Sequence, residues 1–60
     1  MTVQDIISKI HNGTCHIWIF EQDTGELRFK EIWHNKIPDI LRQREINKIE
    51  IGRYEMRLYI

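Results

Sequence analysis

The sequence contains one cysteine, Cys15, and therefore cannot form a disulfide bond within the chain. A lone thiol is more typical of a reducing cytoplasm than of a secreted scaffold. Domains of this size often supplement a small core with a disulfide, a metal or a second copy. Because the chain has no disulfide and few metal ligands, self-association is one expectation for its 60 residues.

Net charge and long apolar runs are also absent. Nine Lys and Arg residues balance nine Asp and Glu residues, which argues against a strongly basic nucleic-acid binder and against an acidic mimic of DNA. No apolar run approaches the ~18 residues of a membrane span, and the N-terminus lacks the features of a signal peptide. We expect one small domain over residues 1–60, located in the cytoplasm and without a membrane partner.

Catalytic motifs are equally scarce. Asp23-Thr24-Gly25 is spelled like the tripeptide of aspartic proteases, but that chemistry needs two carboxylates that share a proton in a buried site. Here the tripeptide lies between Gln22 and Glu26, at an expected exposed turn, and these residue types are typical of turns. We interpret it as an ordinary turn and expect no enzymatic activity.

The cysteine and the histidines do not make a convincing metal site. Cys15 and His16 are adjacent on an expected strand and face opposite ways. The expected register brings His16 and His34 to one face, where two histidines could hold zinc only weakly, since a structural site wants four ligands. We therefore expect no metal, no cofactor and a buried, unreactive Cys15.

Residues 14–33 hold both tryptophans and both phenylalanines and predict a β-hairpin. Aromatic and β-branched residues on both flanks favour strands. Asp23-Thr24-Gly25 suits a three-residue loop in which Gly25 takes a positive φ. Such a loop closes Gln22 against Glu26 and fixes the register of the whole hairpin.

Counting outward from this turn sets Trp18 opposite Lys30 and Phe20 opposite Arg28, and opposite residues share a face. Both pairs are expected to make cation–π contacts. The expected core face consists of Cys15, Ile17, Ile19, Leu27, Phe29 and Trp33. The opposite face mixes aromatic with basic side chains, which solvation alone does not require. This predicted aromatic-basic face consists of His16, Trp18, Phe20, Arg28, Lys30 and Ile32.

One short helix is expected before this hairpin and another after it. Apolar residues at helical spacing predict the first helix over residues 2–12, with Thr2 as its N-cap and Asp5 at the positive end of its dipole. A second helix of one to two turns is expected over residues 38–43, where Pro38 suits the first turn.

The tail, residues 45–60, alternates as strands do, and Gly52-Arg53 fits a two-residue turn. The resulting register sets Glu50 opposite Glu55, which is unfavourable. The alternative is one long strand with a bulge at Gly52.

These elements predict an α+β domain in the order α-β-β-α-β-β. Its two hairpins would form a four-stranded, mainly antiparallel sheet, and both helices would cover one face of that sheet.

The chain also resembles, in its pattern of turns and apolar positions, small uncharacterised proteins of bacteriophages and mobile elements of Gram-positive bacteria. The positions that carry the resemblance are Gly13-Thr14, Asp23-Thr24-Gly25-Glu26, Ile37-Pro38, Ile46-x-x-Ile49 and Leu58-Tyr59-Ile60. Trp33 departs from the group, most of whose members have a small residue near that position. The resemblance implies a cytoplasmic accessory protein and implies no activity.

Our leading hypothesis is a small non-enzymatic interaction protein that binds a protein partner, or a second copy of itself, through the predicted aromatic-basic face, because Trp, Tyr and Arg dominate interface hot spots. An alternative is that single-stranded nucleic acid or a nucleotide stacks on Trp18 and Phe20, with Arg28 and Lys30 on phosphate. A further interpretation is that this face is covered by the chain's own helices or by a dimer mate.

Overall fold

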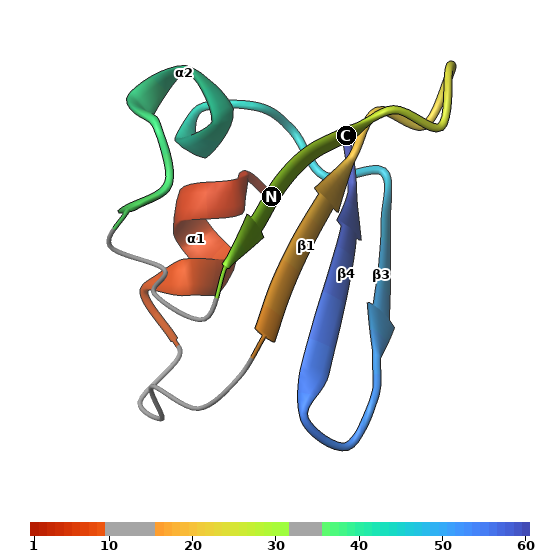
Figure 1. Ribbon diagram of the computed structural model, residues 1–60. Coiled ribbons are helices and arrows are strands. Elements are labelled where there is room, and N and C mark those ends of the chain that lie inside the picture. The colour runs from red at the N-terminus through yellow and green to blue at the C-terminus, as the bar shows by residue number, and fades with distance from the viewer. Residues whose placement is uncertain (10–15, 32–35) are drawn as a thin grey trace.

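The computed structural model describes residues 1–9, 16–31 and 36–60 (Figure 1). Its elements are α1 (Val3–Ile7), β1 (His16–Phe20), β2 (Leu27–Glu31), α2 (Asp39–Arg42), β3 (Lys48–Ile51) and β4 (Glu55–Tyr59). The predicted α+β class, the four strands and the order of the elements are confirmed.

The sheet is mixed rather than mainly antiparallel. Its strands lie in the order β2-β1-β4-β3, and the two hairpins meet through a parallel pairing of β1 with β4. This parallel pair corrects the prediction. It places the two strands with the most buried side chains at the centre, where Ile17, Ile19 and Leu58 are fully buried, and leaves the more charged β2 and β3 at the edges. Burial of apolar area therefore explains a pairing that no local turn specifies.

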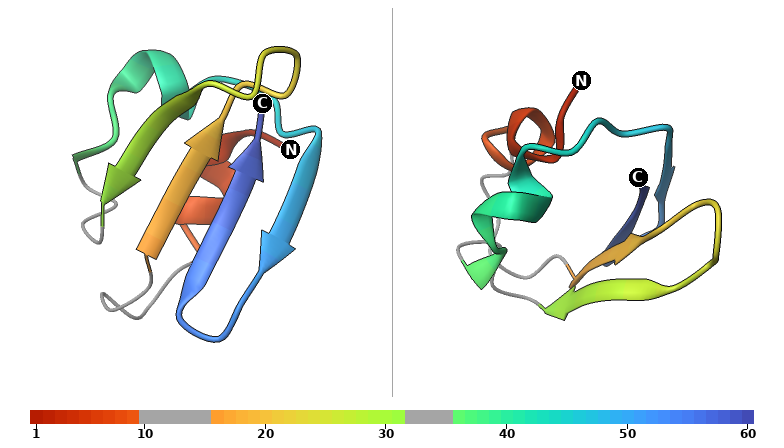
Figure 2. Two further views of the ribbon diagram at one scale, coloured as in Figure 1. Left: turned by 45° about the vertical axis from the view of Figure 1, so that its right-hand side comes forward. Right: turned by 90° about the horizontal axis from the view of Figure 1, so that it is seen from above.

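Both helices lie on one side of the sheet, as expected, and the core lies between the two layers (Figure 2). The buried side chains are Val3, Ile7, Ile17, Ile19, Ile37, Leu41, Leu58 and Ile60. Phe29 is partly buried and packs against this cluster, as the sequence predicts. Leu27 is 43% exposed and does not belong to the core, contrary to the prediction. Cys15 and Trp33 lie outside the described residues.

The first helix is shorter than predicted. Thr2 caps it as expected, because its Oγ1 accepts a hydrogen bond from the Asp5 amide at 3.3 Å and its own amide donates to Asp5 Oδ2 at 2.9 Å. The helix ends at Ile7, with Ser8 as its C-cap. Residues 10–12, which completed the expected helix, lie outside the described part. The second helix, Asp39–Arg42, falls within the expected range, and Pro38 stands just before it as the N-cap.

The first hairpin keeps three of the predicted pairs, Ile17 with Glu31, Trp18 with Lys30, and Ile19 with Phe29. Beyond Ile19 a bulge shifts the register, and Phe20 lies opposite Leu27 instead of Arg28. This shift explains the exposure of Leu27, because opposite residues share a face and Phe20 points away from the helices. Arg28 becomes the extra residue of the bulge.

The turn is also longer than the three-residue loop that was predicted. The Gln22 amide, expected to face Glu26, donates instead to the Ile60 carbonyl at 2.9 Å. The hydrogen bonding between β1 and β4 therefore continues past the end of both strands. The Glu21 amide then donates to the Glu26 carbonyl at 2.8 Å, and residues 22–25 form the loop. Gly25 has φ 75°, which confirms the predicted positive φ.

The tail forms a hairpin, so one long bulged strand is excluded. Its register differs from the prediction by two residues on β4. Glu50 lies opposite Arg57 instead of Glu55, and the Gly52 amide donates to the Glu55 carbonyl at 2.8 Å. The observed register replaces an opposition of like charges by an opposition of unlike charges, which is the favourable cross-strand arrangement.

Candidate functional site

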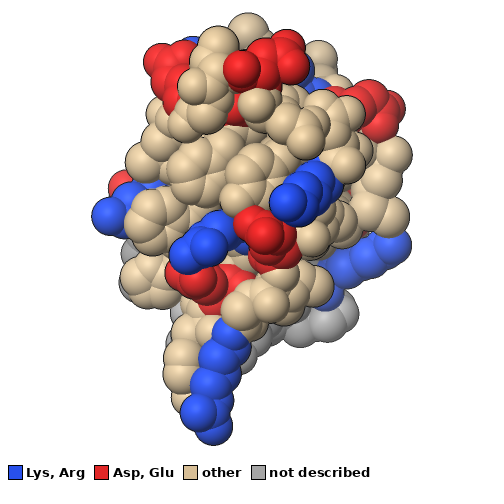
Figure 3. Space-filling model, turned by 90° about the vertical axis from the view of Figure 1, so that its right-hand side faces the viewer, with Lys and Arg blue, Asp and Glu red and all other residues tan. Residues whose placement is uncertain are grey.

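The sheet face that points away from the helices, here called the outer face, is the candidate site. Because side chains alternate along each strand, the register assigns one set of residues to it. They are His16, Trp18, Phe20, Leu27, Lys30, Lys48, Glu50, Glu55, Arg57 and Tyr59. Figure 3, viewed from the β3 side, shows a surface made mostly of uncharged residues (tan), with Lys, Arg, Asp and Glu interspersed among them.

Three aromatic rings form a continuous row on this face. The ring centroids of Trp18 and Phe20 are 6.2 Å apart and their planes differ by 14°, while Phe20 and Tyr59 are 5.4 Å apart with planes at 19°. Trp18 and Phe20 alternate along β1, and the parallel register sets Tyr59 directly beside Phe20. All three side chains are half-buried. Contacts of this kind contribute about 0.5–1.5 kcal/mol each beyond area burial.

A lysine lies over each end of the row. Lys30 Nζ is 4.6 Å from the centroid of the Trp18 ring, which confirms the contact expected from the hairpin register. Lys48 Nζ is 5.4 Å from the centroid of the Tyr59 ring. A cation–π contact of this kind contributes about 0.5–1 kcal/mol to stability at an exposed site. The row is therefore flanked by positive charge on both edge strands.

Carboxylates balance these cations. The Tyr59 hydroxyl donates a 2.6 Å hydrogen bond to Glu50 Oε1, and this bond is the main cause that lowers the pKa of Glu50 and raises the pKa of Tyr59. Arg57 Nη2 lies 2.9 Å from Glu55 Oε1. The β3 and β4 side of the outer face thus carries paired charges of both signs rather than a positive field.

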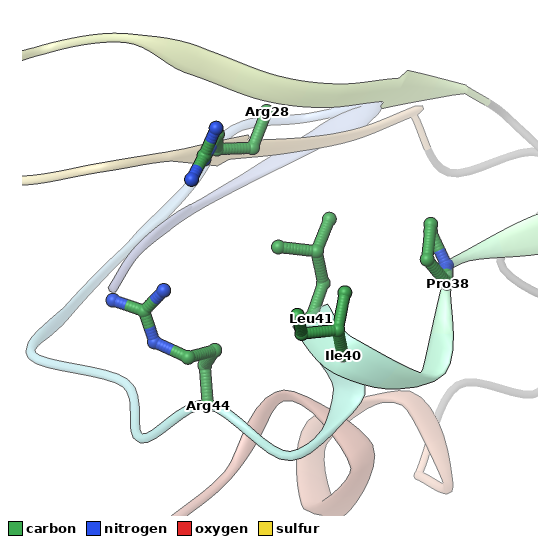
Figure 4. Close-up of a pocket in the computed structure, with 5 residues that line it drawn as sticks. All are labelled: Arg28, Pro38, Ile40, Leu41 and Arg44. Carbon is green, nitrogen blue, oxygen red and sulfur yellow. The ribbon is translucent and has the colours of Figure 1, made fainter.

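Arg28 does not lie on the outer face. The bulge turns its side chain toward α2 (Figure 4), and its guanidinium contacts Glu21 Oε1 at 3.4 Å and Glu26 Oε2 at 3.6 Å. The expected contact of Arg28 with Phe20 is therefore replaced by these ion pairs. His16, Trp18, Phe20 and Lys30 do lie on the outer face. Ile32 lies outside the described residues.

Six outer-face residues were not foreseen from the sequence, and they are Leu27, Lys48, Glu50, Glu55, Arg57 and Tyr59. The alternation in the tail separates Arg57 and Tyr59 from the apolar phase of Met56 and Leu58. That signal places them opposite the core. It does not reveal that β4 pairs with β1, and this pairing is what joins them to Trp18 and Phe20.

A hollow of about 330 Å³ lies between the bulge and α2 (Figure 4). It is lined by Arg28, Pro38, Ile40, Leu41 and Arg44. Glu21 accepts two hydrogen bonds from Arg44, at 2.9 and 3.2 Å, and this arginine is the main cause that lowers the pKa of Glu21. Because each arginine of the hollow already contacts a carboxylate, the hollow has no excess positive charge to offer an anion.

A second hollow, of about 390 Å³, lies at the start of β1. It is lined by His16, Arg53, Tyr54 and Glu55. The Arg53 guanidinium carbon is 5.7 Å from the centroid of the Tyr54 ring, and the His16 amide donates to the Tyr54 carbonyl at 2.9 Å. The β3–β4 turn is thereby held against β1, and the hollow extends the outer face at this end.

Within the described ranges, no group of three or more His, Cys, Asp and Glu residues is arranged to hold a metal ion. The described helices are also too short to cross a membrane. Cys15 and His34 lie outside the described residues.

The chain matches no protein-family model, no curated protein and no solved structure.

Proposed function

We propose that this protein binds a protein partner through the outer face of its sheet and acts as a small, non-enzymatic interaction protein. The observation that carries the proposal is the row of Trp18, Phe20 and Tyr59 on the sheet face that the helices leave uncovered. Aromatic residues and arginine contribute most of the binding energy at many protein interfaces. Arg57, beside Trp18 in the parallel register, adds the arginine.

The state of Trp18 supports this assignment. Its indole N–H is buried and has no hydrogen-bond acceptor among the residues that the structure describes. An unpaired buried donor costs about 1–3 kcal/mol. An indole at this position therefore lowers the stability of the free chain, and we attribute its presence to the role of the ring in binding.

The balance of charge favours a protein over a polyanion. Lys30, Lys48 and Arg57 are offset on the same face by Glu50 and Glu55, and the whole chain has no net charge. A partner with both acidic and basic side chains around an apolar centre matches such a face, as charged residues do at the rims of protein interfaces.

The test compares capture of a partner by the tagged protein and by variants. We expect Phe20→Ala and Tyr59→Ala, each verified as folded by circular dichroism, to lower partner affinity at least tenfold. Ile40→Ala is the control, because it truncates an apolar side chain that is 75% exposed and lies on α2, away from the outer face. Equal capture by the outer-face variants and the control would rule the proposal out.

A second candidate function rests on the lysines that lie over the Trp18 and Tyr59 rings. Bases stack on aromatic side chains and lysines contact phosphate in proteins that bind single strands or nucleotides. Tryptophan fluorescence should then be quenched by an oligonucleotide, with an affinity that falls as salt rises. Trp18→Phe separates the signal of Trp18 from that of Trp33. A flat titration removes this candidate.

A further inference from the structure

We infer that two copies of this chain associate through the free edges of their β3 strands, antiparallel to one another, and form one continuous eight-stranded sheet. This contact is made by backbone groups at an edge of the sheet and uses only Lys48 and Glu50 of the outer face, so it does not depend on the function proposed above. In the pair the two outer faces would lie side by side.

The edge of β3 is open to a second strand. Among the described strands β3 pairs only with β4, and all four of its residues are exposed. The Gly52 amide donates to the Glu55 carbonyl, so these two residues form a hydrogen-bonded pair. Because such pairs alternate along an antiparallel ladder, Ile49 and Ile51 direct their backbone groups away from β4. Unpaired backbone groups of this kind are a template for another strand.

The side chains of β3 that lie on the helix side are poorly covered. Ile49 lies opposite Leu58 and Ile51 opposite Met56, which places both on the side of the core. Ile49 is nevertheless 37% exposed and Ile51 is 76% exposed. A second β3 strand would lay its own Ile49 beside Ile49, and burial of the shared apolar surface would favour association.

The charges of β3 select one register. A continuous sheet keeps each face on one side, so one residue faces its own copy across the two-fold axis. In a pairing centred on β3 that residue is either Ile49 or Glu50. With Glu50 at the axis, two carboxylates oppose each other. With Ile49 at the axis, Lys48 lies opposite the partner's Glu50 and Glu50 opposite the partner's Lys48. The second arrangement makes two cross-strand ion pairs, and it brings the outward amide and carbonyl of Ile49 against those of the partner's Ile49.

The test is molar mass by light scattering over a concentration series of the full chain, extended to about 1 mM because edge pairing buries a small interface. We expect the unmodified chain to approach twice its 7.4 kDa mass. Lys48→Glu and Glu50→Lys each create like-charge oppositions and should each remain monomeric. Lys9→Glu, the same charge change at an exposed position after α1, should leave the dimer intact.

A mixture of the two charge variants makes the register itself testable. In a mixed pair, the carboxylate introduced at position 48 faces the lysine introduced at position 50, and the native Lys48 faces the native Glu50. We expect the equimolar mixture to recover the dimer that each variant alone has lost, which also shows that both variants are folded. An unmodified chain that stays monomeric throughout the series, or a mixture no larger than its components, would overturn the inference.

Discussion

At the scale of single residues, Gly25 shows how far backbone chemistry alone decides the structure. Its φ of 75° lies in the left-handed region, and a Cβ at this position would meet no atom within 4 Å. Any cost of a side chain therefore comes from the backbone conformation and not from a clash. The positive φ could be predicted from the sequence because glycine is the residue that adopts it most readily in a turn, although the exact length of the turn could not.

Gly25→Ala should lower the free energy of unfolding by about 1–2 kcal/mol, the cost of the left-handed conformation for a residue with a Cβ. Gly25→Asn should cost clearly less, because asparagine tolerates this conformation. Urea denaturation of both variants measures the difference. Equal losses for alanine and asparagine would mean that something other than φ controls the turn.

At the scale of elements, Glu21 joins parts of the chain that sequence patterns treat separately. It follows β1, it accepts hydrogen bonds from Arg44 after α2, and it contacts Arg28 in the bulge of β2. These cations lower its pKa, Arg44 being the main cause. The unfolded chain therefore binds a proton on Glu21 at a higher pH than the folded chain does.

This difference predicts how stability depends on pH. The contribution of Glu21 is fully present above its unfolded pKa of about 4.3 and is lost as the pH falls through the lower, folded pKa. Glu21→Gln should flatten the loss of stability on acidification below about pH 4.3. Thermal denaturation at a series of pH values measures it, with Glu31→Gln as a matched control on an exposed carboxylate of β2. A pH profile unchanged by Glu21→Gln would contradict the role assigned to this carboxylate.

The elements also show which parts of the fold the sequence can specify. Local chemistry predicts the Thr2 cap, the Gly25 turn and the pairing of Trp18 with Lys30, because the partners are close in sequence. The bulge at Arg28 occurs together with a hydrogen bond from the Gln22 amide to the Ile60 carbonyl, a contact between distant segments that no local pattern indicates. For the same reason, only part of the candidate site could be predicted from the sequence. Its β1 and β2 members follow from the hairpin, whereas Tyr59 joins them only through the parallel pairing.

At the scale of the whole molecule, one small core holds two layers together. Leu58, on β4, is fully buried, with a relative exposure of 0%. It belongs to a cluster with side chains from both helices and from β1. A core of this size supplies only ~3–5 kcal/mol in domains below about 70 residues. The fold therefore has little stability to lose.

Leu58→Ala should unfold most of the protein at 25 °C, because truncating a buried leucine costs about 2–5 kcal/mol. Ile40→Ala, at a position that is 75% exposed, should change the free energy of unfolding by less than about 0.5 kcal/mol. Far-ultraviolet circular dichroism with urea titration distinguishes the two. A Leu58→Ala variant as stable as Ile40→Ala would show that the core is not where the structure places it.

The central claim is that parallel pairing of β1 with β4 sets Tyr59 beside Phe20 on an uncovered face, since the aromatic row and the proposed function both depend on it. The most direct measurement is the nuclear Overhauser effect between ring protons in the folded chain. The structure predicts cross-peaks between the rings of Phe20 and Tyr59, whose centroids are 5.4 Å apart. Cross-peaks from the Tyr59 ring to Val3 or Ile7 of α1 instead would place Tyr59 in the core and contradict the account.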